Sequence, residues 1–91
     1  IHAGQLGFRV LLVESQKFPR EKVCGGCLNR RSQRQLQELE VWDELLAAGA
    51  IELTRLRIRA GSTETCWPIP SLFSVRRSTL DNLLVQRAIE C

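Results

Sequence analysis

The stretch GFRVLLVE, residues 7–14, decides the fold that the sequence predicts. Its four consecutive apolar residues, 10–13, do not alternate with polar ones, which is typical of a strand buried on both faces of a parallel sheet. Gly7 stands just before the run and tolerates the left-handed conformation with which many helices end. Residues 1–14 therefore predict the end of a helix, a glycine cap and a buried parallel strand that ends at Glu14.

Downstream of this strand, the pattern predicts a loop and then a broken helix. Residues 15–26 are polar and glycine-rich and contain Pro19, which favours a loop. The helix is expected to begin after Asn29, a favourable N-cap residue. We expect a break near Glu40 and an end of the second part at Gly49. The apolar stripe of this helix comprises Leu36, Leu39, Trp42 and Leu46.

The second half of the chain predicts a small antiparallel β element and a last helix. Apolar residues alternate with arginines over residues 55–60, which is the period of a half-buried strand. A turn at residues 61–62 leads into an antiparallel partner over residues 63–67, which the next two prolines are expected to end. Ser78 and Asp81 have the spacing of a capping box at the start of the last helix. The residues expected to face inward from that helix are Leu80, Leu83, Leu84 and Ala88.

Length and composition exclude several classes of protein. The 91 residues, 44% hydrophobic and 25% charged, are typical of one small globular domain rather than of a disordered segment. A net charge of +3 and an aromatic content of 5% do not favour nucleic-acid binding. The sequence contains neither an apolar run of the roughly 18 residues that a membrane span requires nor a signal segment. We therefore expect a cytoplasmic protein with reduced cysteines.

Cys24 and Cys27 form a C-x-x-C pair that leaves three alternatives open: a redox dithiol, half of a zinc site, or two incidental cysteines. A structural zinc site needs a second ligand pair, and His2, Cys66 and Cys91 lack the spacing of such a pair. A redox pair of the thioredoxin type should open a helix, whereas the helix here is expected to begin further along. The sequence therefore predicts no metal site and favours incidental cysteines in a glycine loop.

Three motifs together resemble those of a known flavoenzyme family. They are GFRVLLVE at residues 7–14, FPREKVCGG at residues 18–26 and VRRSTLDNLL at residues 75–84. The chain resembles the FAD-binding region of FAD-dependent oxidoreductases related to geranylgeranyl reductases, which are relatives of aromatic-ring flavoprotein monooxygenases and flavin halogenases. This resemblance implies an α/β fold, namely a partial Rossmann-like FAD-binding domain with a parallel strand, helices and a small antiparallel β element. Residues 1–91 would be a fragment of that single domain, lacking the N-terminal glycine-rich turn and the C-terminal part.

The resemblance also implies cofactor-binding residues, although it leaves the catalytic residues unknown. Glu14 is similar to the carboxylate that binds the ribose of the adenosine half. Arg77, four residues before Asp81, matches the arginine that reaches the ribityl–pyrophosphate part of FAD, and a guanidinium suits phosphate oxygens. Cys27 departs from the family pattern, which has a small residue there. The loop that passes close to the flavin is matched by Lys22, Cys24, Gly25 and Gly26.

The function that the resemblance implies is reduction of the double bonds of an isoprenoid substrate by hydride from NAD(P)H through FAD. The alternative is an FAD-dependent aromatic monooxygenase or halogenase of the same fold. The partner would be a small apolar substrate and no nucleic acid, with peripheral membrane association of the intact enzyme left open. We expect the fragment to be inactive on its own. Two rival classes are a dithiol or metal-binding module on the C-x-x-C pair and a basic binding module that uses Arg30, Arg31, Arg34, Arg55, Arg57 and Arg59.

Overall fold

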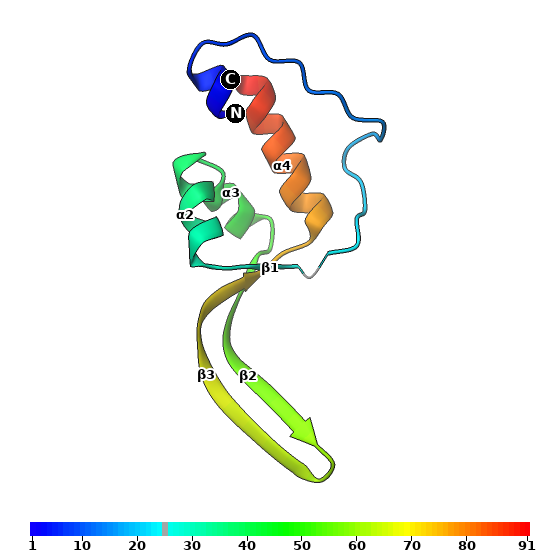
Figure 1. Cartoon of the computed structure of the whole chain (residues 1–91), viewed down its shortest axis with the longest axis vertical. Coiled ribbons are helices and arrows are strands. Elements are labelled where there is room, and N and C mark those ends of the chain that lie inside the picture. Colours follow the sequence, from blue (N-terminus) through cyan, green and yellow to red (C-terminus); the bar gives the residue numbers. More distant parts are fainter. Residues whose placement is uncertain (25) are drawn as a thin grey trace.

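The structure, a computed structural model, describes residues 1–24 and 26–91. Its elements are, in order, α1 (His2–Gln5), β1 (Cys27–Leu28), α2 (Arg30–Glu38), α3 (Trp42–Ala47), β2 (Ile51–Ala60), β3 (Thr63–Ser74) and α4 (Arg77–Glu90). The three strands form one antiparallel sheet in the order β1-β3-β2. The helices gather at one end of the molecule, and the β2–β3 hairpin projects away from them (Figure 1).

The expected partial Rossmann-like fold with a parallel strand is wrong. Every strand pair among the described residues is antiparallel, and residues 9–14 belong to no strand. A strand in a parallel sheet is stabilised by neighbouring strands at its edges and by helices on both faces. The only sheet described consists of the β2–β3 hairpin and the short β1 at its base, so the apolar run passes α4 as an unpaired segment (Figure 1). Its apolar side chains, residues 10–13, are 60% to 88% exposed.

The predicted glycine cap and the predicted broken helix are both confirmed. Gly7 follows α1 with a φ of +83°, in the left-handed region that favours glycine. The Asn29 side chain accepts a hydrogen bond of 2.9 Å from the backbone N–H of Ser32 and caps α2. Glu40 adopts a φ of +60° between α2 and α3, and Gly49 ends α3 with a φ of +99°.

The core is small and lies at the corner between α2 and α3. Its buried apolar side chains are those of Leu36, Val41 and Leu45, and the last two are fully buried. The predicted apolar stripe is right for Leu36 but wrong for Leu46, which is 40% exposed. The left-handed residue between the helices changes the helical phase. As a result, Val41 and Leu45 are buried in place of Trp42 and Leu46, the positions that a continuous stripe predicts. A core of this size stabilises a chain only modestly.

The predicted antiparallel hairpin is confirmed, but it is longer and more exposed than expected. The two strands pair continuously apart from a register irregularity between Leu53 and Arg55. Pro68 and Pro70 were expected to end β3, yet the strand runs on to Ser74. The missing N–H of a proline is tolerated where it faces away from the paired strand, and β3 has a free outer edge at these positions. Backbone pairing between β2 and β3 therefore continues past the two prolines.

Two side-chain contacts help to attach the base of the hairpin to the helices. The rings of Trp42 in α3 and Phe73 in β3 meet edge to face, with centroids 4.8 Å apart. The side-chain amide of Gln33 in α2 donates a hydrogen bond of 3.2 Å to the carbonyl of Ser71. These contacts fix the direction in which the hairpin leaves the helical end.

The predicted capping box at the start of α4 is wrong. The helix begins at Arg77, and the Ser78 hydroxyl donates a hydrogen bond of 3.0 Å to the carboxylate of Glu21 instead of capping the helix. Asp81 binds Arg77 rather than a backbone N–H at the helix start. The Ser78 hydroxyl, which the local spacing predicts to cap the helix, therefore binds Glu21, 57 residues away in the sequence. The inward residues predicted for α4 are half-buried, namely Leu80, Leu83, Leu84 and Ala88.

The far end of α4 contacts both the break between the helices and α1. Arg87 donates a hydrogen bond of 2.9 Å to the carbonyl of Leu39 and also binds the carboxylate of Glu40. A Cβ on Gly4 would lie 3.0 Å from the Cβ of Cys91, so α1 approaches the end of the chain closely. Of the helices in the described part of the chain, none combines the length and hydropathy needed to cross a bilayer.

Candidate functional site

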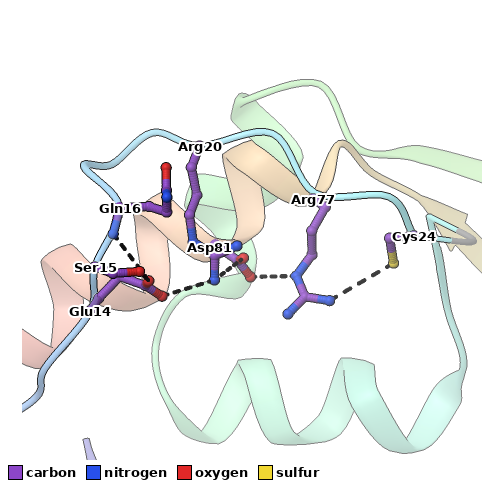
Figure 2. A network of polar contacts seen from close by, with 7 residues as sticks. All are labelled: Glu14, Ser15, Gln16, Arg20, Cys24, Arg77 and Asp81. Carbon is purple, nitrogen blue, oxygen red and sulfur yellow. Dashed lines mark hydrogen bonds and ion pairs between the residues drawn. The ribbon is translucent and has the colours of Figure 1, made fainter.

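A row of side chains with alternating charge connects the segment before β1 with the start of α4 (Figure 2). At its centre lies Arg20, between two carboxylates. Its Nη2 is 3.2 Å from an oxygen of Glu14 and 3.7 Å from Oδ2 of Asp81. Asp81 is buried, whereas Glu14 and Arg20 are partly open to solvent. Arg20 therefore holds the exposed segment against α4 through charge.

Arg77 extends the row from Asp81 to a thiol. The two residues stand four apart on one face of α4, and Nε of Arg77 donates to Oδ1 of Asp81 at 2.5 Å. Nη1 of the same guanidinium lies 3.9 Å from Sγ of Cys24. The hydrogen bonds to Asp81 and then to Cys24 raise the pKa of Arg77 above its ordinary value. Arg76, the preceding residue, is exposed and is not a member of this row.

Glu14 ends the row and is held in its ionised form by local hydrogen bonds. Its Oε1 accepts from the backbone N–H of Gln16 at 3.2 Å and from the hydroxyl of Ser15 at 3.3 Å. The hydrogen bond from Gln16, with smaller contributions from the Arg20 guanidinium and Ser15, lowers the pKa of Glu14. The second oxygen faces Arg20.

Cys24 lies at the other end of the row and has two donors. The backbone N–H of Gly26 lies 3.4 Å from its Sγ, and the Arg77 guanidinium is the second donor. These hydrogen bonds, that from Gly26 first, lower the pKa of the exposed Cys24 thiol. A stabilised thiolate is the nucleophilic and oxidisable form of cysteine.

A largely apolar cavity of about 740 Å³, called here the α4 cavity, lies between α4 and the unpaired segment. Glu14 lines it, and so do apolar residues of both walls, such as Val10 and Leu12 of the segment and Val85 and Ile89 of α4. A smaller cavity of about 220 Å³ is lined by the four charged residues Glu14, Arg20, Arg77 and Asp81, together with apolar neighbours. Glu14 thus lies where an apolar space meets a polar one, an arrangement typical of ligand sites.

The structure brings together three of the predicted site residues. Glu14, Cys24 and Arg77 belong to one row, although Arg77 is 53 residues away from Cys24 in the sequence. Gly26 adjoins the row through its N–H and has a φ of +68°, whereas Lys22 is exposed and does not join the row. The predicted site residue Gly25 lies outside the described residues.

Two members of the row were not assigned to the site by sequence analysis. Arg20 belongs to the Pro-Arg part of the motif at residues 18–26, and that motif was the available signal for it. Asp81 was interpreted as a cap residue because of its spacing from Ser78. Its place four residues after Arg77 on a helix was the signal for an ion pair.

Comparison with known proteins finds no matching family model, no matching curated protein and no matching solved structure. Within residues 1–24 and 26–91, histidine, cysteine, aspartate and glutamate side chains form no group of three or more that could hold a metal ion. The function is therefore argued from the chemistry of the site itself.

Proposed function

We propose that this chain supplies part of the FAD-binding surface of an FAD-dependent oxidoreductase. The observation that carries the proposal is the row of charged residues beside the α4 cavity. This row draws on all three motifs of the resemblance: Glu14 comes from the first, Arg20 and Cys24 from the second, and Arg77 and Asp81 from the third. The first two motifs are neighbours in the sequence, and the third, about 50 residues further on, meets them beside a cavity, as is typical of a shared site.

The residues of the site fit the adenosine diphosphate half of FAD. The Glu14 carboxylate accepts hydrogen bonds and suits the hydroxyls of a ribose. Nε of Arg20 is buried and finds no hydrogen-bond partner among the described residues, so a donor is left that suits a phosphate oxygen. Oδ2 of Asp81 is also buried without a hydrogen-bond partner among the described residues, although Nη2 of Arg20 lies 3.7 Å from it, and it suits a donor such as a hydroxyl. The apolar walls of the α4 cavity suit an adenine ring.

Bound FAD would supply hydride transfer between a nicotinamide cofactor and an organic substrate. The chain's own residues bind and orient the cofactor: Glu14 holds the ribose, while Arg20 and Arg77 offset the charge of the phosphates. The loop with Lys22 and Cys24 lies close to the flavin in the proteins that the chain resembles. That resemblance favours reduction of isoprenoid double bonds with NAD(P)H, by an enzyme that is cytoplasmic and acts on a small apolar substrate.

The direct test is a titration of the chain with FAD, ADP and FMN, followed residue by residue by NMR. We expect FAD and ADP to shift the signals of Glu14, Gln16 and Arg20, and FMN to leave them unchanged, because FMN lacks the adenosine half. We expect weak binding, with a Kd of about 1 mM, since the family's phosphate-binding glycine turn is not among residues 1–91. Glu14→Ala should weaken FAD binding by about tenfold.

Glu38→Ala is the matched control, because it removes an exposed carboxylate from α2, away from the row. It should leave the affinity for FAD unchanged. The proposal fails if FMN shifts the same residues as strongly as FAD does. It also fails if Glu14→Ala and Glu38→Ala have equal effects.

A further inference from the structure

The outer edge of β2 is open for pairing along its length. In the sheet order β1-β3-β2, this strand has a neighbour on one side only within the described part of the chain. The outer edge of β3 is interrupted, since Pro68 and Pro70 have no N–H to donate. β2 contains no proline and is ten residues long. The projecting hairpin therefore offers one long edge with uninterrupted backbone donors and acceptors (Figure 1).

The hairpin has one basic face and one apolar face. Residues paired directly across antiparallel strands point to the same side, and side chains alternate along each strand. On the apolar face, Leu56 lies opposite Trp67, and Ile58 is two residues further along β2. These three side chains are 46%, 50% and 44% exposed, respectively. The other face carries the three arginines Arg55, Arg57 and Arg59.

The basic face has an excess of positive charge. Arg57 and Arg59 share the one carboxylate of Glu64, at 3.2 Å and 2.8 Å. Their side chains remain 72% and 73% exposed, and Arg55 is exposed as well. Three guanidinium groups thus stand against a single carboxylate, and a partner with acidic side chains at every second position would balance them.

We propose that the outer edge of β2 binds an extended segment of a partner protein in which acidic and apolar residues alternate. The segment pairs with β2 through backbone hydrogen bonds, as in strand addition to an exposed sheet edge. Its acidic side chains lie beside Arg55, Arg57 and Arg59, and its apolar side chains lie beside Leu56 and Ile58. This interaction is separate from the proposed FAD site, which lies at the helical end of the molecule.

Other occupants match only part of this surface. A second copy of β2 would place arginines beside arginines, and like charges on adjacent strands are destabilising. A nucleic acid would use the basic face and leave the apolar face in water. An anionic bilayer would take up the apolar face while the arginines point away from the headgroups. The alternating segment matches the edge and both faces.

The test uses the whole chain and a synthetic peptide of alternating glutamate and valine, as long as β2. Backbone amide exchange is followed by NMR, together with the indole signal of Trp67. We expect the peptide to slow exchange in β2 but not at residues 63–70 of β3. Methylation of the peptide nitrogens that face β2 should abolish this protection, because it removes the donors without changing the side chains.

Charge reversal separates strand addition by an acidic segment from other modes of binding. Arg57→Glu should weaken binding of the glutamate–valine peptide by about threefold to tenfold and strengthen binding of a matched lysine–valine peptide. Arg34→Glu, an exposed arginine on α2, should change neither affinity. The proposal is overturned if β2 gains no protection or if both peptides bind the unaltered chain equally. Displacement of the peptide by a single-stranded oligonucleotide or by anionic vesicles would overturn it as well.

Discussion

At the scale of single residues, Arg77 joins a buried carboxylate to an exposed thiol. Its Nε is held by Asp81 and its Nη1 lies 3.9 Å from Cys24, so that the guanidinium has a fixed direction. An arginine with one edge held by a carboxylate offers the other edge as a directed donor. The reactivity of Cys24 should therefore depend on a residue 53 positions away in the sequence.

We expect Arg77→Gln to slow alkylation of Cys24 by iodoacetamide near neutral pH. Loss of the guanidinium removes a donor that lowers the pKa of Cys24, so less thiolate is present at a given pH. The measurement is the rate of alkylation against pH in a chain whose other cysteines are replaced by serine. Arg76→Gln is the control, because Arg76 is exposed and lies outside the row. Equal slowing by Arg77→Gln and Arg76→Gln would contradict the contact between Arg77 and Cys24.

The carboxylate of Glu14 gives a prediction for the pH dependence of stability. Its pKa is lowered below its ordinary value, first by the hydrogen bond from the N–H of Gln16, so folding favours the ionised form. Such a group contributes stability that is fully present above the unfolded pKa and lost as the pH falls through the folded pKa. Glu14→Gln should therefore reduce the free energy of unfolding near neutral pH, and the difference from the unaltered chain should shrink in acid.

Urea unfolding at a series of pH values measures this difference. The control is Glu38→Gln, an exposed carboxylate on α2, which should leave the free energy of unfolding nearly unchanged near neutral pH. A difference for Glu14→Gln that grows as the pH falls would contradict the direction of the pKa shift.

At the scale of elements, the start of α4 offers a test of whether Ser78 acts as a local helix cap or through its contact with the distant Glu21. If Ser78 were an N-cap, aspartate would replace it without loss, because both residues are good caps. In the structure Ser78 is buried and donates to the carboxylate of Glu21 at 3.0 Å. We therefore expect Ser78→Asp to destabilise the chain by about 1–3 kcal/mol, since a second carboxylate would be placed at a buried position facing Glu21, which would lose its donor.

Ser78→Ala completes this test, because it removes the hydroxyl without adding charge. We expect a smaller loss of about 1 kcal/mol, measured by thermal unfolding followed by circular dichroism. If Ser78→Asp is as stable as the unaltered chain, the serine caps the helix after all.

The sequence could predict the elements that depend on local contacts, but not those that depend on contacts between distant segments. The cap at Asn29 and the break at Glu40 depend on contacts within a few residues, and both were predicted correctly. The strand at residues 9–14 depends on neighbours that only the tertiary arrangement supplies, and here no described strand lies beside it. Of the site, the sequence indicated Glu14, Cys24 and Arg77 but not the ion pairs that join them.

At the scale of the whole molecule, the chain is far more extended than a compact domain of its length. Its radius of gyration is 16.5 Å, against about 12 Å expected for 91 residues. Its accessible surface is 7312 Å², against about 5,400 Å² expected from its mass. Both values follow from the projecting hairpin and from the largely exposed apolar run at residues 10–13. Stability should therefore be concentrated at the helical end and at the base of the hairpin.

Two substitutions in the same hairpin test this distribution of stability. Phe73 lies at the base, where its ring packs edge-on against Trp42 with a centroid distance of 4.8 Å. Leu56 lies further along the hairpin and is 46% exposed. We expect Phe73→Ala to cost about 2 kcal/mol, below the range for a fully buried phenylalanine because Phe73 is only half-buried. We expect Leu56→Ala to stay within about 0.5 kcal/mol of the unaltered chain.

The measurement is urea unfolding followed by the helical signal in circular dichroism, which reports on α2, α3 and α4 rather than on the hairpin. A large effect of Phe73→Ala on that signal means that the base of the hairpin belongs to the same cooperative unit as the helices. A small effect of Leu56→Ala means that the outer part of the hairpin does not. Equal losses from the two substitutions would show that the hairpin unfolds with the helices along its whole length, contrary to the exposure of its outer half.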